Sequence, residues 1–439
     1  MRPSARIAAL IELVEEVEAG IAKGGLPADA IVNQYFRARR YAGSKDRRAV
    51  TEMLYDILRK RELLLWVLSA VSTKLEARPL VIAYLTLYRE DDLELFSEAG
   101  QFATTALTDE ELVFTSAVSD VALSEAPEAI RLNIPAWAVA GITARFGEAL
   151  GEAANALNVA ATVDLRINPL KVEKTFINEL IKTSEGFEKS VFSPLGVRSP
   201  KNIGLGGIPA YKRGQLEVQD EAAQIASLLV DAQAGMQVAD LCAGAGGKSL
   251  LVSARMENKG QLYALDTSEK RLTECKKRLD RAGNRNVQLV PLTLAAGERK
   301  TALAPMQDKC DRVYVDVPCS GTGTWRRSPD QRWRFTDAKM KDLNETQYGL
   351  LVEGAGLVKD GGRLIYMTCS LLPAENEAVV ERFLAETKNA WRILDYKDVW
   401  PQVMDSDAPQ SAATLEGTLQ LTPHLHQTDG FYIAIFEKN

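Results

Sequence analysis

The stretch VADLCAGAGGKS at residues 238–249 decides the expected fold. A short apolar strand pattern runs into three glycines within four positions, and a helical pattern follows directly. Glycines at a strand-to-helix turn allow the backbone to approach a ligand at the N-terminus of the helix. The sequence therefore predicts a ligand-binding turn at the end of a strand in an α/β sheet.

The pattern around this turn predicts a doubly wound sheet over residues 216–439. Five short apolar runs are expected to be strands, at 238–242, 262–265, 287–290, 313–317 and 364–367. Amphipathic stretches at 249–256, 268–282 and 337–358 fall between three of the pairs. Alternating strands and helices favour a mostly parallel, Rossmann-like sheet. Ligands bind such sheets beyond the C-terminal ends of the strands.

Two further regions precede this domain. Residues 1–145 carry apolar side chains at three- and four-residue spacing and are expected to be all-helical. Residues 146–215 are expected to form a small α/β subdomain, with a strand at 162–167, a helix near 172–183 and a Gly-rich turn at 204–207. The 439 residues are thus predicted to form three domains.

The composition excludes several classes of protein. No apolar run approaches the roughly 18 residues of a membrane span, and the N-terminus does not resemble a signal peptide. Five scattered cysteines without a CxxC pair argue against a disulfide framework or a zinc site, and favour a reducing cytoplasm. His424 and His426 have no evident third ligand, so no metal is expected. Nothing in the sequence demands more than a monomer.

The net charge is −6, but positive charge is concentrated locally. Between residues 37 and 61 there are nine Lys/Arg against three Asp/Glu. Such a segment is either an RNA-binding surface or a solvated helix face, and the sequence alone leaves both open. The candidate RNA contacts here are Arg37, Arg40, Arg47 and Arg48.

The glycine-rich turn fits some ligands and not others. A phosphate-binding P-loop would need glycine at Cys242, and a dinucleotide fingerprint counted from Gly244 would need glycine at Ser249. S-adenosylmethionine needs such a turn together with an acid after the second strand, and Asp266 stands there. An acid at this position is equally suited to binding the ribose of NAD. A third interpretation is a tight turn that binds no ligand, with an incidental Asp after it.

Two cysteines follow predicted strands. Cys319 comes after the fourth strand, close behind Asp316, and Cys369 comes after the fifth. A free cysteine is usually a small buried apolar residue, which is the expectation for Cys275 and Cys310. Two cysteines at neighbouring strand ends suit covalent catalysis, because a thiolate added to carbon 6 of cytosine makes carbon 5 nucleophilic toward a methyl sulfonium.

The motifs at 240–249, 316–323, 368–370 and 373–377 resemble the bacterial Sun/Fmu (RsmB-like) branch of the NOL1/NOP2/Sun RNA cytosine-C5 methyltransferases. The resemblance covers essentially the whole chain. Residues 214–224, 165–171 and 429–432 resemble that family's entry to the catalytic domain, its small subdomain and its closing strand. Residues 45–66 resemble, more loosely, its NusB-like helical RNA-binding domain. The resemblance implies a class I methyltransferase fold.

The resemblance also implies roles for individual residues. Cys369 would be the nucleophile, Cys319 would assist product release, and Asp316 would contact the base and support N3. Lys248 would favour the thiolate, and Asp266 would hold the cofactor ribose. The residues expected to line the S-adenosylmethionine site are Cys242, Ala243, Gly244, Gly246, Gly247, Lys248, Asp266, Arg271 and Asp316.

The sequence departs from the family pattern at two places. Gly244-Ala245 replaces the usual Ala-Pro of the loop, a conservative change. Residues 292–296 contain no carboxylate, whereas the family has an Asp there that contacts the adenine amine. The contact with adenine is therefore open, and we expect weaker cofactor binding.

The loop after Cys319 interleaves cations and aromatic rings, as suits phosphates and unstacked bases of RNA. Its candidate substrate contacts are Arg326, Arg327, Arg332 and Trp333, with Trp325 and Arg334 beside them. The alternative is an exposed loop with core tryptophans.

These observations together predict S-adenosylmethionine-dependent methylation of cytosine C5 in RNA, most readily 16S rRNA. An amino-group methyltransferase would need an Asn/Asp-Pro-Pro-aromatic motif at 316–319, which the sequence lacks. The other hypothesis is a ribosome-assembly factor with a non-catalytic methyltransferase fold. Methyl transfer from the cofactor would discriminate between the two.

Overall fold

The computed structural model describes residues 1–97, 102–184, 186–199, 207–293 and 295–439. The chain forms two compact units, one of residues 1–159 with 324–337, the other of residues 160–323 with 338–439. The first unit extends past the expected boundary at residue 145, because helix α9 (Leu150–Leu157) belongs to it. It also includes a segment from the second half of the chain, residues 324–337, which the sequence did not suggest.

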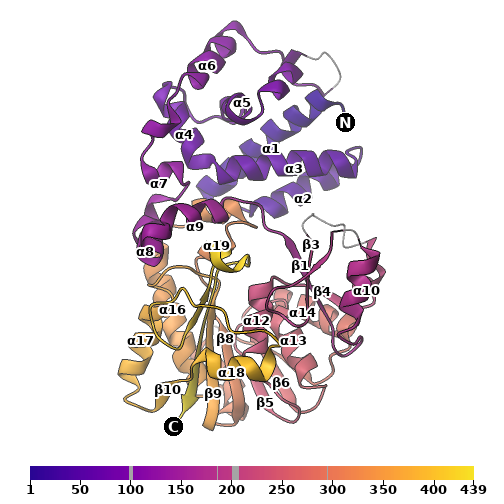
Figure 1. The fold of residues 1–439 in the computed structure, drawn as a ribbon, viewed down its shortest axis with the longest axis vertical. Coiled ribbons are helices and arrows are strands. Elements are labelled where there is room, and N and C mark those ends of the chain that lie inside the picture. Colours follow the sequence, from indigo (N-terminus) through magenta and orange to yellow (C-terminus); the bar gives the residue numbers. More distant parts are fainter. Residues whose placement is uncertain (98–101, 185, 200–206, 294) are drawn as a thin grey trace. The chain divides into compact units, whose positions relative to one another are not determined.

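The first unit is helical, as expected (Figure 1). Apolar residues of α1 at three- and four-residue spacing, such as Leu10, Leu13 and Val17, are buried against those of α3, such as Leu54. Its helices are α1 (Pro3–Lys23), α2 (Ala28–Ala38), α3 (Ser44–Arg59), α4 (Arg61–Ala70), α5 (Ala77–Tyr88), α6 (Asp109–Ser119), α7 (Glu128–Arg131), α8 (Ala136–Phe146) and α9, with 3-10 turns such as η1 (Glu90–Ser97) and η7 (Pro329–Trp333).

The main sheet of the second unit has the strand order β10-β12-β9-β8-β5-β6-β7, and β11 pairs with β12. The five expected strands are confirmed as the parallel part, and β10, β11 and β12 are antiparallel additions. The strands are β5 (Gln237–Asp240), β6 (Gln261–Asp266), β7 (Val287–Pro291), β8 (Cys310–Asp316), β9 (Val358–Thr368), β10 (Trp391–Ile393), β11 (Leu419–Leu421) and β12 (Phe431–Lys438).

Helices cover both faces of this sheet (Figure 1). Successive side chains of a strand point to opposite faces, so Val238 packs into one apolar core while Ala239 packs into the other. The helices are α12 (Glu221–Leu228), α13 (Gly247–Arg255), α14 (Glu269–Ala282), α15 (Ala296–Leu303), α16 (Asp337–Ala355), α17 (Glu377–Glu386), α18 (Tyr396–Val403) and α19 (Pro423–His426).

A second, antiparallel sheet has the order β2-β3-β1-β4. It consists of β1 (Val163–Ile167), β2 (Glu188–Lys189), β3 (Gly196–Ser199) and β4 (Leu216–Val218). Helix α10 (Phe176–Thr183) lies between β1 and β2 in the sequence, and α11 (Pro209–Lys212) lies between β3 and β4. The sheet therefore runs past the expected subdomain limit at residue 215. Of the expected Gly-rich turn, residues 204–206 lie outside the described part of the chain.

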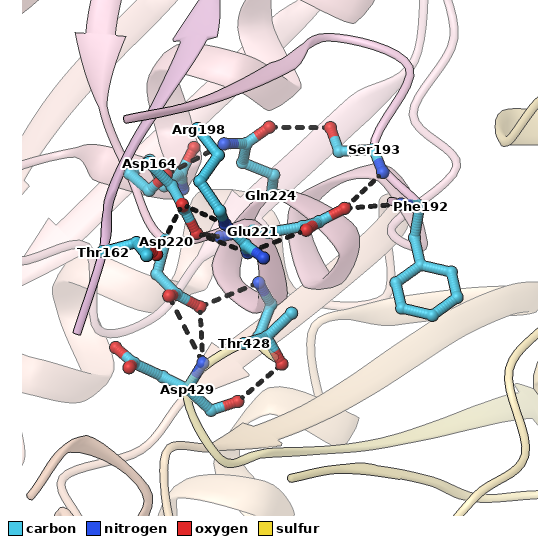
Figure 2. A network of polar contacts seen from close by, with 12 residues as sticks. Thr162, Asp164, Phe192, Ser193, Arg198, Asp220, Glu221, Gln224, Thr428 and Asp429 are labelled. Carbon is cyan, nitrogen blue, oxygen red and sulfur yellow. Dashed lines mark hydrogen bonds and ion pairs between the residues drawn. The ribbon is translucent and has the colours of Figure 1, made fainter. Parts of the chain in front are cut away.

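A network of charged groups joins the small sheet to the main domain (Figure 2). Arg198 of β3 binds Asp164 of β1 at 2.8 and 3.1 Å and Glu221 of α12 at 3.0 Å. Asp220 caps α12 and accepts a hydrogen bond from the backbone N–H of Asp429 at 3.2 Å. The network thus ties both the small sheet and the start of β12 to one end of α12.

Candidate active site

The predicted crevice lies at β5, where the order of the strands in the sheet changes direction. β5 is central, with β6 on one side and β8 on the other, and all three strands are parallel. The loops after such neighbouring strands diverge and leave room for a ligand. The residues that follow β5, β6, β8 and β9 therefore meet at one edge of the sheet.

The glycine-rich turn after β5 has the conformation that its sequence predicts. Gly244 and Gly246 have φ of 55° and 78°, which favour glycine. A Cβ at Gly246 would lie 2.4 Å from Cys275 Sγ, whereas one at Gly244 would meet no atom within 4 Å. The backbone of Gly244 thus borders open space that a cofactor can fill.

Asp266, the last residue of β6, holds the turn. Its Oδ2 accepts a hydrogen bond from Gly244 N at 2.8 Å, and its Oδ1 accepts one from Ser268 N at 2.7 Å. Each carboxylate oxygen can accept a further hydrogen bond. The residues present therefore fit a ligand that offers a pair of ribose hydroxyls beside Gly244, as S-adenosylmethionine does.

Two residues of the small subdomain support the same turn from behind, and sequence reasoning assigned them no role. The buried Arg166 donates to Gln219 Oε1 at 2.6 Å, and both side chains donate to the Gly247 carbonyl, at 3.4 and 3.3 Å. The available signal was an arginine in the middle of an apolar strand pattern, because a buried guanidinium must find acceptors.

The two cysteines at the strand ends lie in contact. Cys319 follows β8, Cys369 follows β9, and their Sγ atoms are 3.0 Å apart. The hydrogen bond with Cys369 and burial raise the pKa of Cys319 well above the usual value for a thiol. Cys319 therefore keeps its proton and can donate its S–H to Cys369 Sγ.

Lys248 and Asp316 form an ion pair beside the cysteines, with Nζ 2.5 Å from Oδ2. Burial acts to lower the pKa of Lys248, but the charge and hydrogen bond of Asp316 outweigh it and raise the pKa above its usual value. The ammonium also lies 4.9 Å from the centre of the Phe431 ring. Lys248 is thus held as a cation, while the Asp316 side chain remains 30% exposed toward the crevice.

The remaining predicted cofactor residues divide into two groups. Cys242, Ala243 and Gly247 belong to the turn itself, and burial raises the pKa of the Cys242 thiol, which therefore stays protonated. Arg271 is exposed and lies in the first turn of α14, where its backbone N–H donates to Ser268 Oγ at 3.4 Å. Its cofactor role stays a prediction. Cys275 and Cys310 are fully buried, as expected.

Segment 324–337 belongs to the helical unit, which changes the interpretation of its cations. Arg332 is 1% exposed and donates to Asn133 O at 3.1 Å, Asn158 Oδ1 at 2.7 Å and Leu157 O at 3.2 Å. Trp333 is partly buried and donates to Leu58 O at 2.8 Å. The expected RNA contact does not fit Arg332, because the side chain is buried and both of its terminal nitrogens donate to protein acceptors.

The other residues of the segment and the basic stretch differ in exposure. Trp325 and Arg326 are buried, as the core-tryptophan alternative allowed, and Arg327 is partly exposed. Arg47 is partly buried and donates to Ala42 O at 2.8 Å. Three of the predicted RNA contacts are exposed, namely Arg37, Arg40 and Arg48.

The histidines belong to a short helix rather than a loop. His426 is buried, its Nδ1 and Nε2 lie 2.9 Å from Thr422 N and Gln410 O, and burial lowers its pKa. Among the described residues we find no group of three or more potential metal ligands. No helix in the same part of the chain is long and apolar enough to cross a membrane.

Comparison with known proteins agrees with this geometry. Residues 227–437 match the family described as 16S rRNA methyltransferase RsmB/F. A probable ribosomal RNA small subunit methyltransferase B of Synechocystis sp. is 33% identical over 314 residues, which are 70% of this chain and 67% of that protein.

Two solved structures share the fold. A protein titled PH0851 is 24% identical with a TM-score of 0.77, covering 100% of this chain and 99% of that one. NSun6 from Pyrococcus horikoshii, solved with SFG, is 18% identical with a TM-score of 0.60, covering 69% and 98%. On the family match and the identity to the relative, the chain belongs to the RsmB/F family of S-adenosylmethionine-dependent ribosomal RNA methyltransferases.

Proposed function

We propose that this enzyme methylates carbon 5 of a cytosine in 16S rRNA through a covalent bond between Cys369 Sγ and carbon 6 of the base. The observation that carries the proposal is the contact between Cys369 and Cys319 beside the Lys248–Asp316 pair. A thiolate, a second thiol, a fixed cation and a carboxyl group are the functional groups that this reaction requires.

The first half of the reaction uses Cys369, Lys248 and Asp316. The Lys248 ammonium and the Cys319 S–H stabilise a thiolate on Cys369, because both place positive charge or a hydrogen near its sulfur. Attack on carbon 6 forms the S–C6 bond and moves the ring electrons toward N3, which takes up a proton from water and then donates a hydrogen bond to the Asp316 carboxylate. Carbon 5 becomes an enamine carbon and a nucleophile. S-adenosylmethionine supplies an electrophilic methyl group when it is bound.

The second half releases the product. The proton on carbon 5 must leave, and the S–C6 bond must break as the ring regains its double bond. Cys319 is placed to assist, since its sulfur lies against that of Cys369. Its raised pKa means that the thiol needs a neighbour to take its proton before it can act as a base.

The RNA-binding surface that we propose is the exposed part of the basic stretch on the helical unit. Arg37, Arg40 and Arg48 are exposed around the turn between α2 and α3, together with Tyr41, which is 57% exposed. Exposed cations bind phosphates, and an exposed aromatic ring can stack on an unpaired base. Arg61 of the same stretch is less exposed and is held by Glu18, so it is not included in this surface.

The test is methyl transfer to 16S rRNA from a strain lacking the gene, read by bisulfite sequencing. The Cys369→Ala variant should transfer no methyl group, and Cys319→Ala should accumulate a denaturation-resistant protein–RNA adduct. Cys310→Ala is the matched control, because it removes a buried thiol at the far end of β8 and should stay active. An active Cys369→Ala variant would overturn the proposal, and so would a Cys319→Ala variant that turns over normally without an adduct.

A further inference from the structure

A buried carboxylate lies between the two cysteine loops. Glu375 is 0% exposed and lies between β9 and α17. Its Oε1 accepts hydrogen bonds from Ser320 N at 2.8 Å and from Gln347 Nε2 at 2.9 Å. Its Oε2 accepts hydrogen bonds from the hydroxyls of Ser320 and Ser370. Ser320 and Ser370 are the residues that directly follow Cys319 and Cys369.

The donors around Glu375 match what a carboxylate can accept. An ionised carboxyl group is an acceptor with about four lone-pair sites, and four donors point at it. Burying such a charge is costly unless its oxygens are hydrogen-bonded. Three elements supply the donors, namely the loop after β8, the loop after β9 and helix α16. Glu375 therefore fixes these elements to one another.

The residues before the cysteines are held in the same way. Gln347 donates a second hydrogen bond to Pro318 O at 3.0 Å, so the Cys319 loop is bound on both sides of the cysteine. Asn376 accepts from Thr368 Oγ1 at 2.6 Å and donates to Ser370 O at 3.0 Å, which binds the Cys369 loop likewise. Glu375 also connects the two loops with each other, beside the hydrogen bonds from Gly323 N to Cys369 O at 2.9 Å and from Leu371 N to Thr322 Oγ1 at 2.8 Å, and it is the only charged group among these links.

We infer that Glu375 is a positioning residue that holds the sulfur of Cys319 against that of Cys369 throughout the catalytic cycle. The inference rests on the proposed function, in which both sulfurs act on one base. Release requires the second thiol to reach the adduct on the first, so the spacing of the loops controls the rate of that step. A purely structural carboxylate would affect the stability of the fold without changing how the two thiols react in the folded protein.

The spacing of the thiols can be measured without RNA or cofactor. Diamide oxidises two thiols to a disulfide: the S–S bond forms, and the two electrons and two protons pass to diamide, which becomes the hydrazine. The rate of forming the Cys319–Cys369 bond depends on how close the sulfurs are held, since they must approach to about 2.05 Å. Peptide mapping by mass spectrometry follows this pair separately from the other cysteines.

The decisive variant is Glu375→Gln in the full chain. Glutamine keeps the shape and accepts from Ser320 N, but its NH2 group cannot accept the hydrogen bonds that the hydroxyls of Ser320 and Ser370 donate to the carboxylate. Ser320→Ala is a milder second variant that removes one hydroxyl donor. Glu377→Gln is the matched control, because that buried carboxylate binds Thr414 N at 3.1 Å.

In Glu375→Gln we expect slower disulfide formation and a fall in kcat of about 10- to 100-fold, as for a small displacement of reacting groups. The dissociation constant of S-adenosylmethionine should not change, and Ser320→Ala should fall between wild type and Glu375→Gln. A folded Glu375→Gln protein with the oxidation rate and kcat of Glu377→Gln would overturn the inference. A failure of the proposed function can be distinguished from a failure of this inference. In that case the wild-type enzyme would transfer no methyl group, while the rates of oxidation by diamide would still report the spacing of the two thiols.

Discussion

Substitution of Gly323 by alanine should damage both the fold and the active site. Gly323 N donates to Cys369 O at 2.9 Å, and Gly430 N donates to Gly323 O at 2.9 Å. A Cβ at Gly323 would lie 2.2 Å from Gly430 O and 2.6 Å from Gly430 Cα. The loop after β8 and the start of β12 thus approach each other more closely than any side chain permits.

The size of the effect follows from these distances. Ordinary contact of a Cβ begins at 3.4 Å, so the two segments must separate by 3.4 minus 2.2, or about 1.2 Å. The obstructing atoms are backbone, which cannot rotate away, and overpacking of this kind costs about 1–3 kcal/mol. The same displacement shifts Phe431 relative to Lys248 and strains the hydrogen bond between Gly323 N and Cys369 O. A shift of about 1 Å at reacting groups can lower the rate about 100-fold.

The assay pairs denaturant unfolding with single-turnover methyl transfer at saturating S-adenosylmethionine. Gly349→Ala is the control, because a Cβ there in α16 meets no atom within 4 Å, and alanine should stabilise the helix by about 0.5–1 kcal/mol with no change in rate. Gly323→Ala should unfold at lower denaturant and react about 100-fold more slowly. A Gly323→Ala protein with wild-type stability and rate would refute the reasoning.

Three further substitutions test other parts of the molecule. Arg332→Met removes the donor from two buried carbonyls and from the partly buried Asn158 Oδ1, and it should lower the free energy of unfolding by about 3 kcal/mol in a urea titration, whereas an unchanged midpoint would show that these bonds contribute little. Burial raises the pKa of Asp240 to about 7, so the stability that the protonated carboxyl group contributes is present at low pH and is lost as the pH rises through 7. The wild-type protein should therefore be about 1 kcal/mol less stable at pH 8 than at pH 6, and Asp240→Asn should remove that difference. Arg40→Ala with Arg48→Ala should weaken RNA binding and lower the salt slope of log K by about 1–2, and an unaltered slope would place the RNA elsewhere.

The parallel half of the main sheet could be predicted because each strand is a short apolar run bounded by turns and followed by a helix. Cys319, Cys369 and Asp266 could be placed at one edge of the sheet for the same reason, since the C-terminal ends of parallel strands share that edge. Once the ends of the strands are located, the positions of these residues can be predicted without knowing how the side chains pack.

The shortest antiparallel strands and the supporting residues were beyond this reasoning, although the strand at 162–167 and the closing strand at 429–432 were expected. β10 and β11 are three residues long, too short for a period to show, and they exist because β12 offers an edge for pairing. Glu375 lies in the motif at 373–377, but its role could not be derived from the sequence, because that role depends on where Ser320 and Gln347 lie after folding. The cations of segment 324–337 had the composition of an RNA-binding loop, and composition cannot tell a guanidinium that faces solvent from one that faces carbonyls.

Segment 324–337 has a consequence for catalysis that follows from connectivity alone. It begins five residues after Cys319 and ends at the start of α16, the helix whose Gln347 holds Pro318 and Glu375. The N-terminal end of the segment is thus joined directly to the loop that carries Cys319. Its C-terminal end is joined to α16, which holds the same loop through Gln347. Arg332 and Trp333 fasten the segment within the helical unit. A change in the helical unit that moves this segment, including one caused by RNA, would be transmitted through the chain to Cys319, the residue that we propose assists product release. We therefore expect Arg332→Met to slow product release as well as to destabilise the helices.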